Sequence, residues 1–589
     1  MDAGSLCAEH ILDGLRPHPR LIVDRTRLAR IRELTQGDGF AAAALRSILA
    51  EAAGMRRTGP LRRDMKQVEG TLALLLTCSL AWRLAGDREA LDGAREHLSA
   101  ICAEPPWPRA TFLAIGELAY GMAVAYDWLR DDLPAAEREA LRRYLVEAIL
   151  AQGLAAYDEG DWWIDSAINW NHESNGGLII AALAVADTDP DIARAILPRA
   201  LRWFDLALEG YDPDGGWDEG AGYWNRATMF AVYSMAALHS ALGTDFGLSD
   251  RPGLARTGSF FLAAIGPTHL LARYADCSPG RRVRSLAPQL LWLAGRYGQP
   301  ELARSEVAYA ATTGFHPAHL WWYEPPAPAP APPLDNLFRG PGPFASMRSA
   351  WDDPHALFTW LKGGNSQVNH GHLDQGNFEL DALGQRWARD LGTDDYSLPG
   401  YFDRQPGGRR WDWYRLGSLS HSVPLIDGAN QQPAAIARIT GFLADPQDPR
   451  VVADLSEAYK PAAGVARRGL MLVRRRALLV QDEFNLAKPC RFTWAMTTDA
   501  EIAIAGATAI LSLGGERLTA TILEPAGAVF TQESAERPPP EAPNTGVRRL
   551  LIDQHGVQGR MRVVVLLAPH WPDGQPVAPP AILPLGRWF

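Results

Sequence analysis

The stretch WWYEPPAPAPAPPLDNLFRGPGP, residues 321–343, constrains the fold of this chain more than any other. Proline lacks an amide hydrogen and has a fixed φ, so a run this rich in proline forms neither a helix interior nor a central strand. It behaves instead as a semi-rigid, extended spacer. With 589 residues the chain also exceeds what one hydrophobic core usually serves. We therefore expect one domain in residues 1–325, a linker in 326–343 and a second domain in 344–589.

The hydrophobic pattern changes at this linker. Before it, apolar residues recur at three-to-four spacing, as in 109–132 and 191–210, and roughly ten such segments predict antiparallel helix pairs. After it, short β-rich segments alternate with Gly, Asp and Pro turns, which is typical of an antiparallel β-sandwich. NFELDAL (377–383) and RWARDLG (386–392) are expected to pair across a GQ turn. The expected fold class is a multidomain α+β protein, helical first and all-β second.

Charge and apolar runs exclude some classes of protein. A formal net charge of -10 argues against nucleic-acid binding, which needs a basic face. The most apolar run, 71–86, is short and contains Arg83, so a buried helix is expected rather than a membrane span. The first twenty residues show no basic start followed by an apolar run, hence no visible signal peptide. As written the chain indicates a cytoplasmic protein; a trimmed N-terminus would fit a periplasmic or secreted one.

The cysteines are odd in number, scattered, and without CxxC spacing. We expect them to be reduced core thiols rather than a disulfide framework or a thiolate metal site. They are Cys7, Cys78, Cys102, Cys277 and Cys490.

A Gly- and Asn-rich segment, residues 365–392, places His370 and His372 on either side of one glycine. In a strand, residues two apart share a face, so both histidines and Asp374 would project together. If the strand NFELDAL continued straight back toward His372, His372 would lie roughly 23 Å from the residue that pairs with Asp390. Joint ligation therefore requires the chain to fold back, which Gly371 and Gly376 permit.

A third histidine, His421, stands in the segment GSLSHSVPLIDG, at the head of another expected strand. Two histidines and one aspartate form a plausible zinc set with a water in the fourth position. The alternative from the residues alone is that these are polar turn histidines that cap loops.

A second cluster lies in DWWIDSAINWNHESNGG, residues 161–177. Amides beside an imidazole can bind and neutralise a carboxylate, and tryptophans offer stacking faces to sugar rings. The alternative is helix-capping asparagine and core tryptophan between two helices. The residues in question are Asn169, Asn171, His172 and Asn175, with Trp162, Trp163 and Trp170.

A third candidate is the loop YDPDGGWDEGAGYWNRA, residues 211–227, which leads into an expected helix. Tyr223 and Trp224 stand at the entrance of that helix. A tyrosine beside glycines can serve as an acid–base group, although most loop tyrosines only pack. Nucleotide-binding and nucleophile-elbow patterns do not occur in a supporting strand and helix context.

Taken together, HPRLIVDRTRLARIRE, NWNHESN, DGGWDEGAGYWNRA, NHGHLDQGNFELDALGQRWARDLG and LSHSVPLIDG resemble the heparinase II/III-like family of polysaccharide lyases. The resemblance runs from about residue 18 to the C-terminal sandwich, and NHGHLDQG is its most specific part. It implies an incomplete (α/α) toroid followed by an antiparallel β-sandwich, which agrees with the hydrophobic patterns.

The resemblance also implies roles for single residues. Asn171 and His172 correspond to the family's catalytic amide and imidazole, Tyr223 to its tyrosine, and His370 to a catalytic-site histidine. His372, Asp390 and His421 correspond to ligands of a structural zinc. The segment LSHSVPLIDG departs from the family pattern, because Ser422 and Pro424 stand in a block that often reads HNT followed by apolar residues. The ligand histidine itself, His421, is retained.

A second family tyrosine corresponds to Tyr401 or Tyr414. Substrate contacts are expected from Trp170, Asn175, Trp217, Trp224, Asn369 and Arg404.

The activity that the resemblance implies is β-elimination at C4 of a uronic acid in an anionic polysaccharide. Asn171 would neutralise the uronate carboxylate, and Tyr223 would move protons, with His172 as the alternative base. We expect these groups to meet His370 between the two domains.

Other functions stay open at this point. Within the same fold, the substrate could be a glycosaminoglycan or alginate. Outside it, the candidates are a glycoside hydrolase, a water-activating metal hydrolase and a non-catalytic sugar-binding protein. A hydrolase pair would come from Asp212, Asp214, Asp218 and Glu219.

Overall fold

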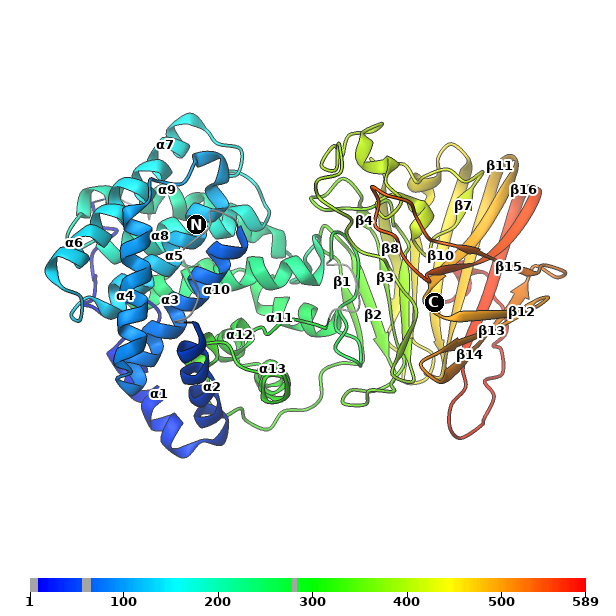
Figure 1. The fold of residues 1–589 in the computed structure, drawn as a ribbon. Coiled ribbons are helices and arrows are strands. Elements are labelled where there is room, and N and C mark those ends of the chain that lie inside the picture. Colours follow the sequence, from blue (N-terminus) through cyan, green and yellow to red (C-terminus); the bar gives the residue numbers. More distant parts are fainter. Residues whose placement is uncertain (1–8, 56–64, 278–282) are drawn as a thin grey trace. The chain divides into compact units, whose positions relative to one another are not determined.

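Helices make up most of the chain as far as the proline-rich segment (Figure 1). The computed structural model describes residues 9–55, 65–277 and 283–589. Its α-helices are α1 (Arg25–Gly37), α2 (Gly39–Met55), α3 (Met65–Ala85), α4 (Arg88–Ala103), α5 (Phe112–Leu129), α6 (Ala135–Arg143), α7 (Ala151–Glu159), α8 (Asn169–Val185), α9 (Pro190–Leu208), α10 (Gly220–Leu242), α11 (Leu254–Ala263), α12 (Gln289–Tyr297), α13 (Pro300–Thr313) and α14 (Ala318–Trp322).

The helix boundaries follow local chemistry. The Asp24 side chain accepts a hydrogen bond from the Arg27 amide (2.8 Å) and so caps the start of α1. Proline stands at the start of α9, where a missing amide hydrogen costs nothing. Gly160 and Gly298 end α7 and α12 in the left-handed conformation that glycine adopts without strain.

Helices α5 and α8 pack backbone to backbone. A Cβ added at Gly177 would lie 2.2 Å from the Gly116 carbonyl oxygen, and one at Gly116 would lie 2.5 Å from that of Glu173. Only glycine permits this approach. It buries almost every residue of α8, the helix that opens with the NWNH motif.

The chain forms two units, each described here by itself. The helical unit comprises residues 1–212, 225–258 and 285–330, and the sheet unit comprises 213–224, 259–284 and 331–589. The last division lies within the expected linker. Two segments that the sequence patterns place in the helical domain, 213–224 and 259–284, belong to the sheet unit.

Two antiparallel sheets form most of the sheet unit (Figure 1). One has the order β1-β2-β3-β5-β6; the other runs β12-β13-β14-β16-β11-β10-β9-β8-β4, with β15 on β16 and β7 on β11. The bounds are β1 (Asp335–Phe338), β2 (Phe344–Arg348), β3 (Phe358–Lys362), β4 (Gly364–Asn365), β5 (Phe378–Ala382), β6 (Gln385–Ala388), β7 (Leu425–Ile426), β8 (Ile436–Leu443), β9 (Arg450–Asp454), β10 (Ala463–Val473), β11 (Ala477–Thr498), β12 (Glu501–Ala505), β13 (Thr508–Leu513), β14 (Glu516–Glu524), β15 (Phe530–Ser534) and β16 (Arg548–Pro569).

The core of the sheet unit lies between these sheets. Met347 and Leu361 from the smaller sheet and Leu470 and Val565 from the larger one join a single apolar cluster, as in a sandwich. The expected pairing of NFELDAL with RWARDLG is confirmed, because β5 pairs antiparallel with β6.

The described residues of the segment 259–284, namely 259–277 and 283–284, include side chains that pack against the smaller sheet. The ring of Tyr274 lies 5.8 Å from the rings of both Phe344 and Trp360, which are fully buried. Buried Arg348 donates to the Ile265 carbonyl (2.9 Å). These long-range contacts explain why this segment belongs to the sheet unit despite its place in the sequence.

Two expectations concern single features. Cys78, Cys102, Cys277 and Cys490 are free thiols, as expected, and Cys7 lies outside the described residues. Among the described helices one window, Val68–Ala85 in α3, is long and apolar enough to span a membrane; 56% of it is buried within the protein, as in a core helix.

Candidate functional site

Tyr223 lies in the first turn of α10 and contacts two other aromatic side chains of the sheet unit. Its ring stacks on the imidazole of His370, with centroids 4.1 Å apart and planes at 16°. Its hydroxyl is 2.6 Å from the hydroxyl of Tyr396. The structure thus brings together Tyr223 and His370, which the sequence singles out, and adds a second tyrosine that it does not.

Burial raises the pKa of Tyr223 well above that of a free tyrosine. The hydrogen bond to Tyr396 and the negative charges of Asp276 and Glu219 raise it further. Burial also raises the pKa of Tyr396, while its hydrogen bond with Tyr223 acts in the opposite direction. Both phenols are therefore protonated in the free protein at neutral pH.

Asp276 connects His370 to the other histidine of the HGH sequence. His370 Nδ1 donates to one carboxylate oxygen (2.7 Å) and His372 Nε2 to the other (2.9 Å). The hydroxyl of Tyr401 (2.7 Å) and a guanidinium nitrogen of Arg410 (3.0 Å) donate to the second oxygen as well. Burial alone would raise the pKa of Asp276, but these donors hold it below its usual range, so the group is a carboxylate.

The HGH sequence forms a tight turn, not the strand in which residues two apart share a face. His370 has φ 62°, in the left-handed region, and a Cβ at Gly371 would lie 2.2 Å from the Ser366 carbonyl oxygen. His370 and His372 converge on Asp276, whereas Asp374 accepts from Lys362 Nζ (2.5 Å). The expectation that all three project together is thus corrected, because the turn and not a strand sets their directions.

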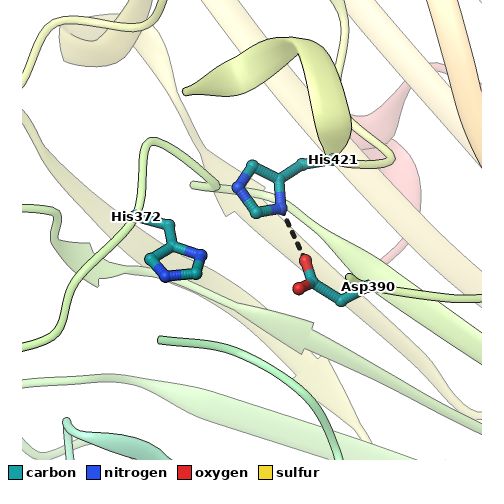
Figure 2. Close-up of side chains that lie close together, drawn as sticks. All are labelled: His372, Asp390 and His421. Carbon is teal, nitrogen blue, oxygen red and sulfur yellow. Dashed lines mark hydrogen bonds and ion pairs between the residues drawn. The ribbon is translucent and has the colours of Figure 1, made fainter. Parts of the chain in front are cut away.

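His372, Asp390 and His421 face one another (Figure 2). One ligand atom from each lies within 4.8 Å of the others, and all three side chains are fully buried. The expected convergence is therefore observed, and β5, β6 and the bend at Gly376 (φ 82°) produce it. His421 Nδ1 is 2.5 Å from Asp390, which also accepts from Asn377 Nδ2 (2.7 Å).

This set fits a divalent metal ion. The Nδ1 atom of His372 and the Nε2 atom of His421 are buried without any hydrogen-bond partner, although unpaired buried nitrogens are costly. Burial lowers the pKa of His372, which favours the neutral imidazole that binds metals. Burial alone would raise the pKa of Asp390, but the neighbouring His421 lowers it and keeps the group ionised. Two imidazoles and one carboxylate suit zinc among other ions.

The NWNH residues lie in the helical unit. The Asn171 amide donates to the carbonyls of Ile164 (2.9 Å), Ser166 (2.9 Å) and Trp203 (3.1 Å), and its oxygen accepts from Asn175 (2.9 Å). In this conformation it holds the chain before α8 in place. Its role in neutralising a carboxylate stays a prediction.

His172 and Asn175 are also fully buried in α8. Burial lowers the pKa of His172 to about 3, so its imidazole is neutral. The His172 ring packs edge-on against Phe204 at 5.5 Å. The Asn175 oxygen accepts from the hydroxyl of Tyr157 (2.5 Å). The proposed catalytic and binding roles of both residues stay predictions.

The tryptophans differ in what they expose. Trp170 is half-buried and lies 4.8 Å from Trp162, which is 59% exposed, so this pair in the helical unit offers an accessible aromatic surface. Trp217 and Trp224, in the sheet unit, are buried, and Trp224 stacks on Phe261 at 4.3 Å. Those two rings present no stacking face in this conformation.

Asn369 and Arg404 lie near the tyrosines of the sheet unit. Asn369 donates to the Glu219 carboxylate (2.8 Å), and half-buried Arg404 contacts the Gln367 backbone. The adjacent Phe402 is 55% exposed and lies 5.3 Å from the Tyr396 ring.

The second family tyrosine has two candidates in the sequence, Tyr401 and Tyr414. Of its two candidates, Tyr401 contacts Asp276, whereas Tyr414 packs beside Leu391 in a separate cluster. Tyr396 is the tyrosine that contacts Tyr223. Sequence reasoning also missed Asp276, Arg410 and Phe402, which follow no motif or periodic spacing.

Comparison with known proteins agrees with this site. Residues 357–565 match the family model described as heparinase II/III-like, C-terminal. This range contains His370, Tyr396 and the three residues His372, Asp390 and His421, which we call the metal-type triad. This match confirms, for the C-terminal part of the chain, the resemblance that the motifs indicate. No curated protein sequence matches the chain.

Solved structures extend the likeness to nearly the whole chain. A heparinase III crystal structure has a TM-score of 0.63 at 13% identity, covering 95% of this chain and 93% of that one. The heparan sulfate lyase of Pedobacter heparinus gives 0.60 at 14%, covering 93% and 92%. A chondroitin AC lyase of Streptomyces coelicolor A3, in complex with chondroitin sulphate, gives 0.52 at 16%, covering 94% and 83%. The expected fold class, an incomplete (α/α) toroid followed by an antiparallel β-sandwich, is confirmed.

Proposed function

We propose that this protein is a carbon–oxygen lyase that cleaves a uronate-containing polysaccharide by β-elimination, leaving a 4,5-unsaturated uronate. The family match and the fold support a polysaccharide lyase. The observation that carries the chemistry is the Tyr223 hydroxyl, held 2.6 Å from Tyr396 and stacked over His370. Phenol and imidazole groups in contact can move the two protons that an elimination requires.

Elimination removes the proton at C5 of the uronate and protonates the leaving oxygen at C4. Tyr223 is protonated in the free protein because burial raises its pKa, so it can donate to the leaving oxygen without any prior step. To take the C5 proton it must first lose its own proton to solvent, and the protonated Tyr396 hydroxyl, 2.6 Å away, can then donate a hydrogen bond that stabilises the Tyr223 phenolate. His172 is the alternative base.

Developing charge on the uronate carboxylate needs stabilisation. Preorganised hydrogen-bond donors at such a position contribute a few kcal/mol, about 2.7–4 for one donor. We assign this role to Asn171, assisted by His370 and Asn175. Phe402, Tyr396 and the Trp162–Trp170 pair offer exposed aromatic surfaces for neighbouring sugars.

His372, Asp390 and His421 would hold a divalent ion, for which we propose zinc. Its contribution would be structural, tying together the turn and strands that carry the three ligands. The chain's own part is to hold His372 next to His370, so that the turn keeps His370 under the Tyr223 ring. Elimination consumes no water, so no water-activating role is required.

For the substrate we propose a glycosaminoglycan such as heparan sulfate, heparin, chondroitin sulfate or hyaluronan. The solved relatives named as heparan sulfate and chondroitin lyases favour this class. Alginate is the alternative uronate polymer on the same fold.

The test is ultraviolet absorbance after incubation with heparin, heparan sulfate, chondroitin sulfates, hyaluronan and alginate, one at a time. A lyase produces an absorbing unsaturated uronate from at least one of them. A glycoside hydrolase would release reducing ends without absorbance, and a binding protein would form no product. Either result would contradict the proposal.

A further inference from the structure

Asp276 is the one carboxylate, among the described residues, that contacts both histidines of the HGH turn. It is 3% exposed, and its two oxygens divide between the histidines, Oδ2 to His370 Nδ1 and Oδ1 to His372 Nε2. A buried carboxylate can only accept hydrogen bonds. Both nitrogens that face Asp276 therefore carry hydrogen.

This arrangement determines which imidazole nitrogens keep a lone pair. In neutral His372 the lone pair is on Nδ1. This nitrogen is buried without a hydrogen-bond partner, and it is therefore available to an ion held by the metal-type triad. In neutral His370 the lone pair is on Nε2, away from Asp276. A carboxylate behind a histidine ligand typically orients the ring and raises its affinity for metal.

The backbone around Asp276 is held in an uncommon conformation on both sides of the contact. Ala275 has φ 55° and His370 has φ 62°, values in the left-handed region that side chains other than glycine seldom adopt. Such strain persists where surrounding contacts over-determine it, and it concentrates at functional sites. Arg410 supplies those contacts, since it donates to Asp276 and to the carbonyls of Gly371 (3.0 Å) and Tyr401 (2.8 Å).

We propose that Asp276 is a positioning residue that sets the hydrogen positions of His370 and His372 and thereby couples the metal-type triad to the catalytic site. The part of the inference that concerns His370 rests on the proposed function. The part that concerns His372 rests on the metal-type triad. Asp276 does not contact substrate in this role; it acts through the two imidazoles.

The test is Asp276→Asn in the full-length protein. Asparagine keeps the shape but replaces one acceptor oxygen by a donor, so one histidine must lose its partner. We expect zinc affinity, measured by competition with a chromogenic chelator, to fall about 10–100-fold. We expect kcat to fall by at least about tenfold while KM changes less than about threefold, as for an interaction that matters in the transition state.

Asp381→Asn is the matched control. Asp381 is also a buried carboxylate of the sheet unit, paired with Arg386 at 2.7 and 3.0 Å, and it contacts neither histidine. It should lower thermal stability without changing zinc affinity or kcat more than about threefold. If Asp276→Asn does not fold, Asp276→Glu, which keeps a charge opposite Arg410, takes its place with the same expectations.

Coupling has its own measurement. Removing the ion from the parent protein should lower kcat, and removing it from Asp276→Asn should lower kcat by a smaller factor, because the link is already broken. Equal factors, or unchanged zinc affinity in the variant, would overturn the proposal. The zinc measurement needs no substrate, so a loss of zinc affinity without any elimination product would refute the proposed function and leave the His372 half of the inference standing.

Discussion

At the scale of the residue, the Tyr223 hydroxyl is the group on which the elimination depends most directly. Tyr223→Phe removes this hydroxyl and keeps the ring that stacks on His370 at 4.1 Å. We expect turnover to fall at least ~10²-fold, as for the loss of a proton-transfer group, with little change in KM or melting temperature. The measurement is the rate of absorbance increase at saturating substrate.

Tyr396→Phe is the informative partner of that variant. If the Tyr396 hydroxyl stabilises the Tyr223 phenolate by a hydrogen bond, its loss should also lower turnover, and the double variant should lose less than the product of the two single losses. Near-normal turnover of Tyr223→Phe, on a polymer that the parent protein eliminates, would transfer the leading role to His172.

Single residues show what a sequence can and cannot indicate. His370, His372 and His421 stand out because histidine is scarce in this chain and because each lies in a recognisable motif. Asp276 and Tyr396 lie in the non-helical, non-strand segments RYADC and TDDYSLPG, which have ordinary loop composition. Their importance comes from contacts with residues more than 90 and 170 positions away, as between Asp276 and His370 and between Tyr396 and Tyr223.

At the scale of the element, helices α3, α5 and α8 place three carboxylates around one guanidinium of α10 in the helical unit. Arg226 donates to Glu117, to Glu173 (2.9 Å) and to Glu69 (2.9 Å). Burial raises the pKa of Glu117 to about 8; Arg226 opposes this shift, and the charges of Glu173 and Glu69 add to it. Glu117 is therefore protonated at neutral pH.

This shift makes stability depend on pH with a definite sign. Between the ordinary pKa of glutamate, 4.5, and about 8, the folded protein holds a proton that the unfolded chain has lost. Its stabilising contribution is complete below the lower value and is lost as pH rises through the upper one. Glu117→Gln resembles the protonated side chain but does not titrate.

We therefore expect the melting temperature of Glu117→Gln, relative to the parent protein, to increase from pH 5 to pH 8. Comparing the two proteins at each pH cancels the other titrating groups. A difference that stays constant across this range would mean that Glu117 is ionised in the folded protein throughout.

A second prediction at this scale concerns the segment between β4 and β5, which carries the metal-ligand candidate His372. An ion bound to folded protein alone stabilises it by about 2.7 kcal/mol at a hundred times its Kd, or roughly 4 °C for a unit as large as the sheet unit. His372→Ala should lower the melting temperature by this order and reduce the metal content from about one ion per chain.

A chelator provides the control for this prediction. It should lower the melting temperature of the parent protein and leave that of His372→Ala unchanged, because the variant has no ion to lose. If His372→Ala keeps both its metal and its melting temperature, the triad does not hold the ion.

Regular elements were the part of the fold that the sequence predicted well. Apolar periodicity indicated the helices, and turn residues indicated the β5–β6 hairpin. The HGH segment is different. A strand would place its two histidines on one face, but the close approach of Gly371 to the Ser366 carbonyl requires a turn, and no periodic pattern indicates such a contact.

At the scale of the whole molecule, the order of segments along the chain does not match the two units. The sheet unit takes up 213–224 and 259–284 from within the helical part of the sequence. The first segment brings Tyr223, and the second brings Asp276 and the Tyr274 ring that covers Trp360. One division, after residue 330, falls within the proline-rich segment, but the chain also crosses between the two units at four other places.

A fragment of residues 331–589, cut at this boundary, tests the consequence. Without 259–284, Arg410 loses its carboxylate partner, Arg348 loses the Ile265 carbonyl, and the buried Trp360 loses part of its cover. Unpaired buried charges and exposed aromatic rings are strongly destabilising. We expect the fragment to melt without a cooperative transition, to bind a hydrophobic dye, and to bind zinc more weakly than the full chain.

The matched control is the full-length protein with a protease site inserted between residues 326 and 330 and then cleaved. It has the same chain break, but it retains 213–224 and 259–284. It should keep the melting temperature and zinc affinity of the uncut protein, because the linker contributes a covalent connection rather than packing. If the fragment 331–589 melted cooperatively and bound zinc as tightly as the cleaved protein, the segments 213–224 and 259–284 would be dispensable for the fold of the sheet unit. Asp276 could then not be what holds the HGH turn in place.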